Sequence, residues 1–305
     1  LVRAMKKDDS KNTKPIKLEL KGGTNASFAP QIDYMTDVFA HFINAYFQQR
    51  GGQPPLHISI IKRGYFPKGG GIIHVNLHNP ISNDFLFLNN TKFPPIILSQ
   101  CLPIVSITIK AFHAGSCPSW VADKMASGAV KELKRAFRDD VHFRKRFLKA
   151  GNNLQGISPS ITNADIQITH ETNCIGSASG ILIVAKPSNE SYSTLPHPAL
   201  AASGLGDRKQ PPNITGQNAA KELVESISSG GCVDRWLQDQ LIPFMALADG
   251  ESSVLTGELT LHTQTAMKVA EQMTGCKFAA QRLDKDDTRE GNEEQEEGYG
   301  ETGCI

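Results

Sequence analysis

Three segments of this 305-residue sequence combine glycines with polar side chains in patterns that suit anions or nucleotides. Residues 21–34 (KGGTNASFAPQIDY) join an expected strand to the start of an expected helix, where backbone N–H groups can hold an anion or the edge of a base. Residues 62–71 (KRGYFPKGGG) interleave basic and aromatic residues with glycines, which suits a phosphate backbone and a stacked base. An ordinary glycine-rich turn is the alternative for both segments.

The third segment contains a candidate nucleophile. Asp239 and Gln240 lie in an expected helix, and His262 follows within residues 257–265 (GELTLHTQT), where a strand is expected to give way to a helix. A side chain at such a junction can point into a cleft, and the start of a helix favours a bound anion. A single histidine is also common as a structural residue, so this position alone leaves both roles open.

Hydrophobic periodicity predicts which elements position these segments. The expected strands are residues 16–21, 57–63, 72–77, 104–112, 165–170, 180–185, 257–261 and 277–282. The expected helices are residues 32–47, 119–137, 213–228, 233–247 and 263–273. Residues 79–95 are expected to form a turn-rich linker and 187–212 a long loop. This order predicts two α+β units followed by a C-terminal piece.

The composition, with 39% hydrophobic and 21% charged residues, is that of a globular protein, and no apolar run reaches the ~18 residues of a membrane helix. We therefore expect no membrane partner. The net charge of +1 hides a body of +8 and an acidic tail of −7 over residues 284–305. Residues 131–149 are rich in Lys and Arg, which indicates either nucleic-acid contact or a solvated face. The six cysteines form no CxxC pair, so neither a zinc site nor a disulfide framework is expected.

Taken together, KGGTNASFAPQIDY, RGYFPKGGG, WLQDQLIPFMALADG and TGELTLHTQTA occur in an order that closely resembles the RNA 3′-terminal phosphate cyclases, in their eukaryotic form. The resemblance covers about residues 16–283. It implies an α+β fold of repeated βαβαββ units, like the C-terminal domain of translation initiation factor three, with an inserted thioredoxin-like α+β domain. The implied division begins with a loose segment at residues 1–15 and a repeat at residues 16–82. The insert follows at residues 83–232 and the C-terminal part of the large domain at residues 233–283. An acidic disordered tail ends the chain at residues 284–305.

The resemblance also implies a reaction. It uses ATP, with Mg²⁺ or Mn²⁺, to convert an RNA 3′-phosphate into a 2′,3′-cyclic phosphate. His262 matches the family's nucleophile, which forms histidine-AMP before AMP passes to the RNA. Splitting the reaction through a covalent intermediate lowers each barrier. The positions that match nucleotide-binding residues of the family are Pro30, Trp236, Leu237, Gln238, Asp239 and Gln240. Arg63, Tyr65 and Lys68 are our own choice for RNA contacts.

The sequence departs from the family in one respect. The family normally opens with a repeat that carries a Glu-Gly-Gly-Gly-Gln motif and an Arg-rich Pro-Gly-Leu segment, and neither occurs here. The first residue is Leu, so we expect a fragment or an incomplete gene model. Two alternatives follow: a non-catalytic relative that binds RNA or a ribosome-assembly partner, and an inactive truncated product. Retention of His262 with Asp239 and Gln240 argues against the first. A carboxyvinyl transferase has no support in these residues. The resemblance to the eukaryotic form implies a nuclear location, in the nucleoplasm, with the cytoplasm as an additional candidate location.

Overall fold

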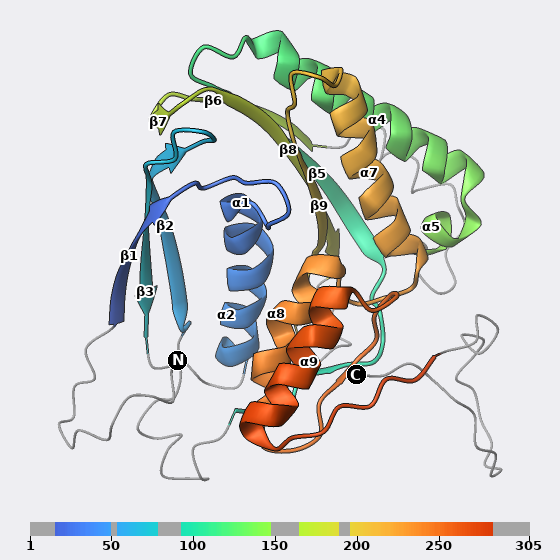
Figure 1. The fold of residues 1–305 in the computed structure, drawn as a ribbon. Helices are drawn as coiled ribbons and strands as arrows, with labels where there is room; N and C mark the ends of the chain where they lie inside the picture. Colours follow the sequence, from blue (N-terminus) through green and yellow to red (C-terminus); the bar gives the residue numbers. More distant parts are fainter. Residues whose placement is uncertain (1–15, 50–53, 79–92, 148–164, 189–195, 283–305) are drawn as a thin grey trace. The chain divides into compact units, whose positions relative to one another are not determined.

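The computed structural model describes residues 16–49, 54–78, 93–147, 165–188 and 196–282 (Figure 1). Contacts between residues group the chain into two units, which are described separately. The first unit comprises Leu1–Thr91 with Leu102–Ser228, and the second comprises Lys92–Cys101 with Ser229–Ile305. Helices and several sheets occur together, as expected of the α+β class. The βαβαββ repeats, the thioredoxin-like insert and the expected domain boundaries stay predictions.

The first unit contains a four-stranded sheet in the order β1-β3-β2-β7. Its strands are β1 (Ile16–Gly22), β2 (Leu56–Gly64), β3 (Gly71–Leu77) and β7 (Cys174–Ile175). Strand β3 pairs antiparallel with both β1 and β2, whereas β7 joins β2 in parallel. One continuous helical run follows β1. Its parts are α1 (Ile32–Tyr34), the π-helical η2 (Met35–Ala40) and α2 (His41–Gln48).

A second sheet in the same unit has the order β6-β5-β8-β9. Its strands are β5 (Ile104–Ala114), β6 (Asp165–Glu171), β8 (Ala178–Pro187) and β9 (Leu200–Leu205). Helices α4 (Ser119–Asp139), α5 (Val141–Lys145) and α7 (Pro212–Ser228) complete this part of the unit. Helices α4 and α7 cover the same face of the sheet, as Figure 1 shows.

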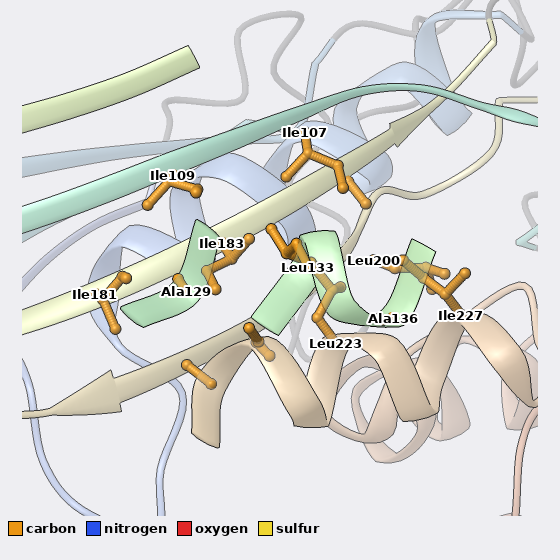
Figure 2. Packing of buried hydrophobic residues seen from close by; sticks show 14 of the residues in the cluster. Ile107, Ile109, Ala129, Leu133, Ala136, Ile181, Ile183, Leu200, Leu223 and Ile227 are labelled. Atoms are coloured by element: carbon orange, nitrogen blue, oxygen red, sulfur yellow. The ribbon is translucent and has the colours of Figure 1, made fainter. Parts of the chain in front are cut away.

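A large hydrophobic cluster lies between this sheet and helices α4 and α7 (Figure 2). Ile107 and Ile109 point towards the helices because alternate residues of a strand share one face. Leu133 of α4 and Leu223 of α7, both fully buried, meet them from the other side. Side chains that recur every second residue in the strands therefore pack against side chains that recur at helical spacing in α4 and α7, and together they form this core.

The second unit is smaller. It contains the parallel pair β4 (Ile97–Leu98) and β10 (Ser253–Val254), and helices α8 (Arg235–Ala246) and α9 (Leu261–Thr274). Helices α8 and α9 pack against each other. No helix among the described residues is both long enough and apolar enough to span a membrane.

Most expected helices and strands are present, but three expectations were wrong. Residues 187–212 were expected to be a loop, but they contain strand β9. The strand gave no signal in the sequence because LAASGL lacks the β-branched residues that favour strands. Residues 257–261 are not a strand: Thr260 caps α9, which begins at Leu261. Residues 277–282 also have no strand, although their alternation favours one. Most of the expected linker at residues 79–95 and the expected acidic tail lie outside the described residues.

Candidate functional site

Helix α9 begins at a threonine cap, and His262 is the second residue of the helix. The backbone of Thr260 is extended, and its Oγ1 accepts a hydrogen bond of 3.1 Å from the N–H of Thr263. The cap satisfies one of the N–H groups that have no partner inside the helix. The helix dipole and the other N–H groups favour negative charge at this end. His262 is exposed here, so its imidazole is accessible to a phosphate.

A buried glutamine of α8 holds the loop in front of α9. Gln238 is 5% exposed. Its Nε2 donates to Thr256 Oγ1 at 2.5 Å and to the carbonyl of Glu258 at 3.3 Å. Its Oε1 accepts from the N–H of Thr260 at 3.2 Å and from Thr263 Oγ1 at 3.0 Å. Because unpaired buried polar groups are costly, this set of bonds fixes the loop relative to α8.

Asp239, the next residue of α8, lies close enough to His262 for their charges to interact. The side chain is half-buried, and this burial raises the pKa of Asp239 above its ordinary value. The charge of His262 and hydrogen bonds from backbone N–H groups act in the opposite direction but do not cancel the effect of burial. The ionised carboxylate is therefore disfavoured by its surroundings, and a protonated imidazole at His262 stabilises it.

The start of α8 is also capped. Asp234 Oδ1 accepts hydrogen bonds of 3.0 Å from the N–H groups of Trp236 and Leu237. The ring of Trp236 is half-buried, and the guanidinium carbon of Arg235 lies 5.4 Å from its centre, within the range of a cation–π contact. Leu237 is fully buried, whereas Gln240 is half-buried. Trp236 therefore retains surface that a ligand could contact, whereas Leu237 belongs to the core.

The glycine-rich segment after β1 forms a polar network inside the first unit. Asn25 Nδ2 donates to Gln31 Oε1 at 3.0 Å and to Asp33 Oδ2 at 3.4 Å. Asp33 in turn accepts two hydrogen bonds, of 2.7 and 2.8 Å, from the guanidinium of Arg63. Arg63 Nε also lies 3.0 Å from a carboxylate oxygen of Glu171 at the end of β6. One buried cation thus joins α1, β2 and β6.

Arg63 and Tyr65 were chosen from the sequence as RNA contacts, and both side chains are buried, at 8% and 1% exposure. Burial lowers the pKa of Arg63, but the hydrogen bonds and charge of Asp33 outweigh this, so the pKa is raised. Burial raises the pKa of Tyr65, whose ring stacks on Phe112 at 5.7 Å. Lys68 is exposed. RNA contact by these residues stays a prediction, and the burial of Arg63 and Tyr65 weighs against it.

Pro30 lies in the first unit, where it lines a cavity of about 370 Å³. The wall is mainly apolar and includes Leu20, Ile58 and Met35. Gln238, Asp239 and His262 all lie in the second unit, where Gln238 bonds Thr263, the neighbour of His262, and Asp239 interacts with the charge of His262. The nucleotide-binding role of Pro30 and of the α8 residues stays a prediction.

Sequence reasoning missed the pairing of Arg63 with Asp33 and Glu171. Asp33 stands in the first turn of an expected helix and Glu171 directly after an expected strand, positions at which acidic residues are ordinary. The network around Thr263 was also missed. The Thr–x–x–Thr spacing of Thr260 and Thr263 resembles a helix cap and could have indicated it.

Fold and site together define an α+β protein that exposes a histidine at a capped helix start, beside a half-buried carboxylate. Residues 10–280 match the family model described as RNA 3′-terminal phosphate cyclase. The chain belongs to this family.

Three relatives illustrate the match. The chain is 30% identical over 281 residues to the probable RNA 3′-terminal phosphate cyclase of Dictyostelium discoideum. The aligned region covers 91% of this chain and 54% of that protein. It is 29% identical over 266 residues to the RNA 3′-terminal phosphate cyclase of Drosophila melanogaster, covering 87% and 62%. It is 29% identical over 265 residues to that of Methanothermobacter thermautotrophicus, covering 86% and 62%. The chain thus spans between 54% and 62% of their lengths.

Proposed function

We propose that this chain carries the nucleotidyl-transfer centre of an ATP-dependent RNA 3′-terminal phosphate cyclase. The observation that supports this proposal is the placement of His262, which is exposed in the first turn of α9 behind a loop fixed by Gln238. Family membership supports the general activity. The finer steps below extend it to this chain.

In the first step, a ring nitrogen of His262 attacks the α-phosphorus of ATP. A nitrogen–phosphorus bond forms, the bond to the bridging oxygen breaks, and pyrophosphate leaves. The start of α9 suits this step because its dipole and free N–H groups stabilise negative charge that develops on the phosphate. Asp239 stabilises positive charge on the imidazole while the phosphorus–nitrogen bond is present.

In the next steps, a 3′-phosphate oxygen of the RNA takes the AMP group from His262, which regains its free nitrogen. The 2′-hydroxyl of the terminal ribose then attacks the activated phosphate, loses its proton and closes the 2′,3′-cyclic phosphate. AMP departs as the leaving group. It leaves more readily than a phosphate oxygen would, which explains why the reaction uses a covalent intermediate.

The side chains of the second unit suggest separate roles in nucleotide binding. Trp236 offers a ring face for the adenine, and Asp239 and Gln240 offer polar groups for the base or ribose. Leu237 and Gln238 act indirectly, through the core and the loop. We also propose a nucleotide-binding role for Pro30, on the strength of the family resemblance.

A divalent cation, Mg²⁺ or Mn²⁺, would neutralise charge on the ATP phosphates. Among the residues that the structure describes, no group of three or more His, Cys, Asp or Glu side chains is arranged to hold a metal. We therefore assign no protein ligand to the cation. The repeated-unit fold, the inserted domain and a nuclear location are also part of the proposal, on the strength of the family resemblance.

The experiment uses ATP labelled at the α-phosphate, with magnesium, followed by denaturing electrophoresis. We expect acid-labile label on the wild-type chain and none on His262→Ala, with His142→Ala as a control because His142 is another exposed histidine. In a second assay the chain is incubated with ATP and an RNA that carries a 3′-phosphate, and the formation of a 2′,3′-cyclic phosphate end is measured. A folded chain without label, or equal label on His262→Ala, contradicts the histidine-AMP proposal. Absence of label combined with RNA binding supports the non-catalytic alternative.

A further inference from the structure

The outer face of α4 carries a stripe of cations that the proposed chemistry does not use. Helix α4 buries one side against the second sheet and α7, through residues such as Met125, Ala129 and Leu133. The opposite side exposes residues at helical spacing, which we call the α4 stripe. The stripe consists of Trp120, Lys124, Lys131, Lys134, Arg135 and Arg138, and all six residues are exposed.

Three cations of the stripe are available for an outside partner. Lys124, Lys131 and Lys134 make no ion pair within the described part of the chain. Arg135 pairs with Glu132 and Arg138 with Asp139. The free ammonium groups repel one another modestly and gain little from the protein, which is the situation that an external polyanion relieves.

An aromatic ring stands in line with these cations. Trp120 lies in the first turn of α4 and is 54% exposed. A ring face beside cations is the arrangement on which single-stranded nucleic acids stack their bases. An acidic protein partner would use the charges but would have no need of the ring.

The stripe is also long enough for an extended chain. From Lys124 to Arg138 the helix rises roughly 21 Å, at about 1.5 Å per residue. Lys145 on α5, which is exposed and follows shortly after α4, extends the positive charge further. One rigid helix therefore presents charge at intervals along a straight line, as a phosphate backbone requires.

We infer that the α4 stripe is a docking surface for the body of single-stranded RNA, with its phosphates on Lys124, Lys131 and Lys134 and a base stacked on Trp120. This inference rests on the proposed function, since that function supplies an RNA substrate. The stripe contributes affinity for the RNA without taking part in the chemistry.

The test measures binding of a 20-nucleotide RNA that ends in a 3′-hydroxyl, so that no reaction is needed. The variant Lys124→Gln/Lys131→Gln/Lys134→Gln is compared with Lys17→Gln/Lys186→Gln/Lys209→Gln, which removes equal charge from exposed positions elsewhere in the same unit. We expect about tenfold weaker binding for the stripe variant, and a salt-dependence slope lower by about 2, since each phosphate contact on a single strand contributes about 0.7. The control should bind within twofold of wild type.

Two further measurements separate the contributions and the hypotheses. Trp120→Ala should weaken RNA binding about fivefold or more without changing the salt slope, and in a Trp236→Phe background RNA should quench the fluorescence of Trp120.

Label on His262 reports the proposed function independently, and it should be the same in the stripe variant and wild type. Equal RNA affinity of the stripe and control variants overturns the inference. The inference is also overturned if the stripe variant loses binding to polyglutamate but keeps its binding to RNA, since that result would indicate an acidic protein partner. Loss of label with stripe-dependent RNA binding retained would contradict only the proposed function.

Discussion

At the scale of single residues, the side-chain amide of Gln238 makes four hydrogen bonds to the loop and first turn around His262. We expect Gln238→Ala to destabilise the second unit by about 2–3 kcal/mol, because Thr263 Oγ1 and the Thr260 N–H lose a buried acceptor. Urea denaturation followed by Trp236 fluorescence in a Trp120→Phe background would measure it. Gln264→Ala is the control, since Gln264 is exposed and makes one bond of 3.2 Å to the Leu259 carbonyl, so its effect should stay within about 0.5 kcal/mol. Equal losses in the two variants would contradict the role of Gln238.

Asp239 leads to a prediction about pH at the same scale. Burial raises its pKa in the folded chain above the ordinary value of 3.8. A group of raised pKa contributes stability that is present below the unfolded value and is lost as the pH rises through the folded value. The ionised form at neutral pH is therefore a cost to stability. We expect Asp239→Asn to raise Tm at pH 7 and to lose this advantage near pH 4 and below. Thermal melts from pH 3 to 8 would show it, and a Tm difference independent of pH would contradict it.

The same substitution should reduce the label on His262, because the imidazole loses a neighbouring negative charge while phosphorus is bonded to it. Stability and activity are then expected to change in opposite directions, as happens at functional sites that hold a strained or poorly solvated group. A gain in Tm together with unchanged label would mean that Asp239 has no part in the chemistry.

At the scale of elements, helices α4 and α7 approach each other closely through glycine. A Cβ on Gly216 would lie 1.9 Å from the Met125 carbonyl oxygen, and one on Gly128 would lie 2.1 Å from that of Asn213. We expect Gly216→Ala to destabilise the first unit by about 3 kcal/mol, because the helices must move apart and the core in Figure 2 must repack. Ser127→Ala, at an exposed position of α4, is the control and should change stability by less than about 0.5 kcal/mol. Chemical denaturation measures both, and a tolerated Gly216→Ala would show that the helices can shift at little cost.

The elements also show what the sequence could and could not indicate. Helix α4 was predictable because apolar residues such as Met125 and Leu133 recur at helical spacing. Strand β9 was not, because its small residues carry no alternation and its place is set by pairing with β8, from Gly180↔Leu205 to Ala185↔Leu200. Residues 257–261 alternate like a strand, but a helix starts there instead, because the N–H of Thr260 donates to Gln238 and Thr260 Oγ1 accepts from the N–H of Thr263. Tertiary contacts decided both cases.

At the scale of the whole molecule, the motifs are divided between the two units. The sequence grouped Asp239, Gln240 and His262 in one candidate site, and in the structure Asp239 interacts with the charge of His262 within the second unit. It also suggested Arg63 as a surface contact, which its burial disfavours. Composition identifies a basic residue but not its partners, and those partners, Asp33 and Glu171, lie 30 and 108 positions away. Long-range ion pairs of this kind leave no local pattern.

Arg63 is therefore the residue through which we would test how the two sheets of the first unit are joined. Strand β2 pairs with β7 through Arg63 N–H to the Asn173 carbonyl at 3.0 Å, and its guanidinium bonds Asp33 and Glu171 nearby. Removal of a buried cation from its acidic partners costs about 3–5 kcal/mol when both are fully buried. Because the two carboxylates are partly exposed and can regain water, we expect about 2–3 kcal/mol for Arg63→Met.

Hydrogen exchange would locate this loss. The amide of Tyr65, which donates to the Ile175 carbonyl at 3.0 Å, should exchange faster in Arg63→Met, because the β2–β7 pairing opens once its side-chain ties are gone. Amides in the core of the second sheet, such as that of Ile183, should keep their protection. Lys62→Met serves as the control, since Lys62 is adjacent on β2 and makes no ion pair among the described residues. Equal exchange at Tyr65 in the two variants would mean that backbone hydrogen bonds alone hold β7 on β2, and that the three charged side chains only fill the space beside them.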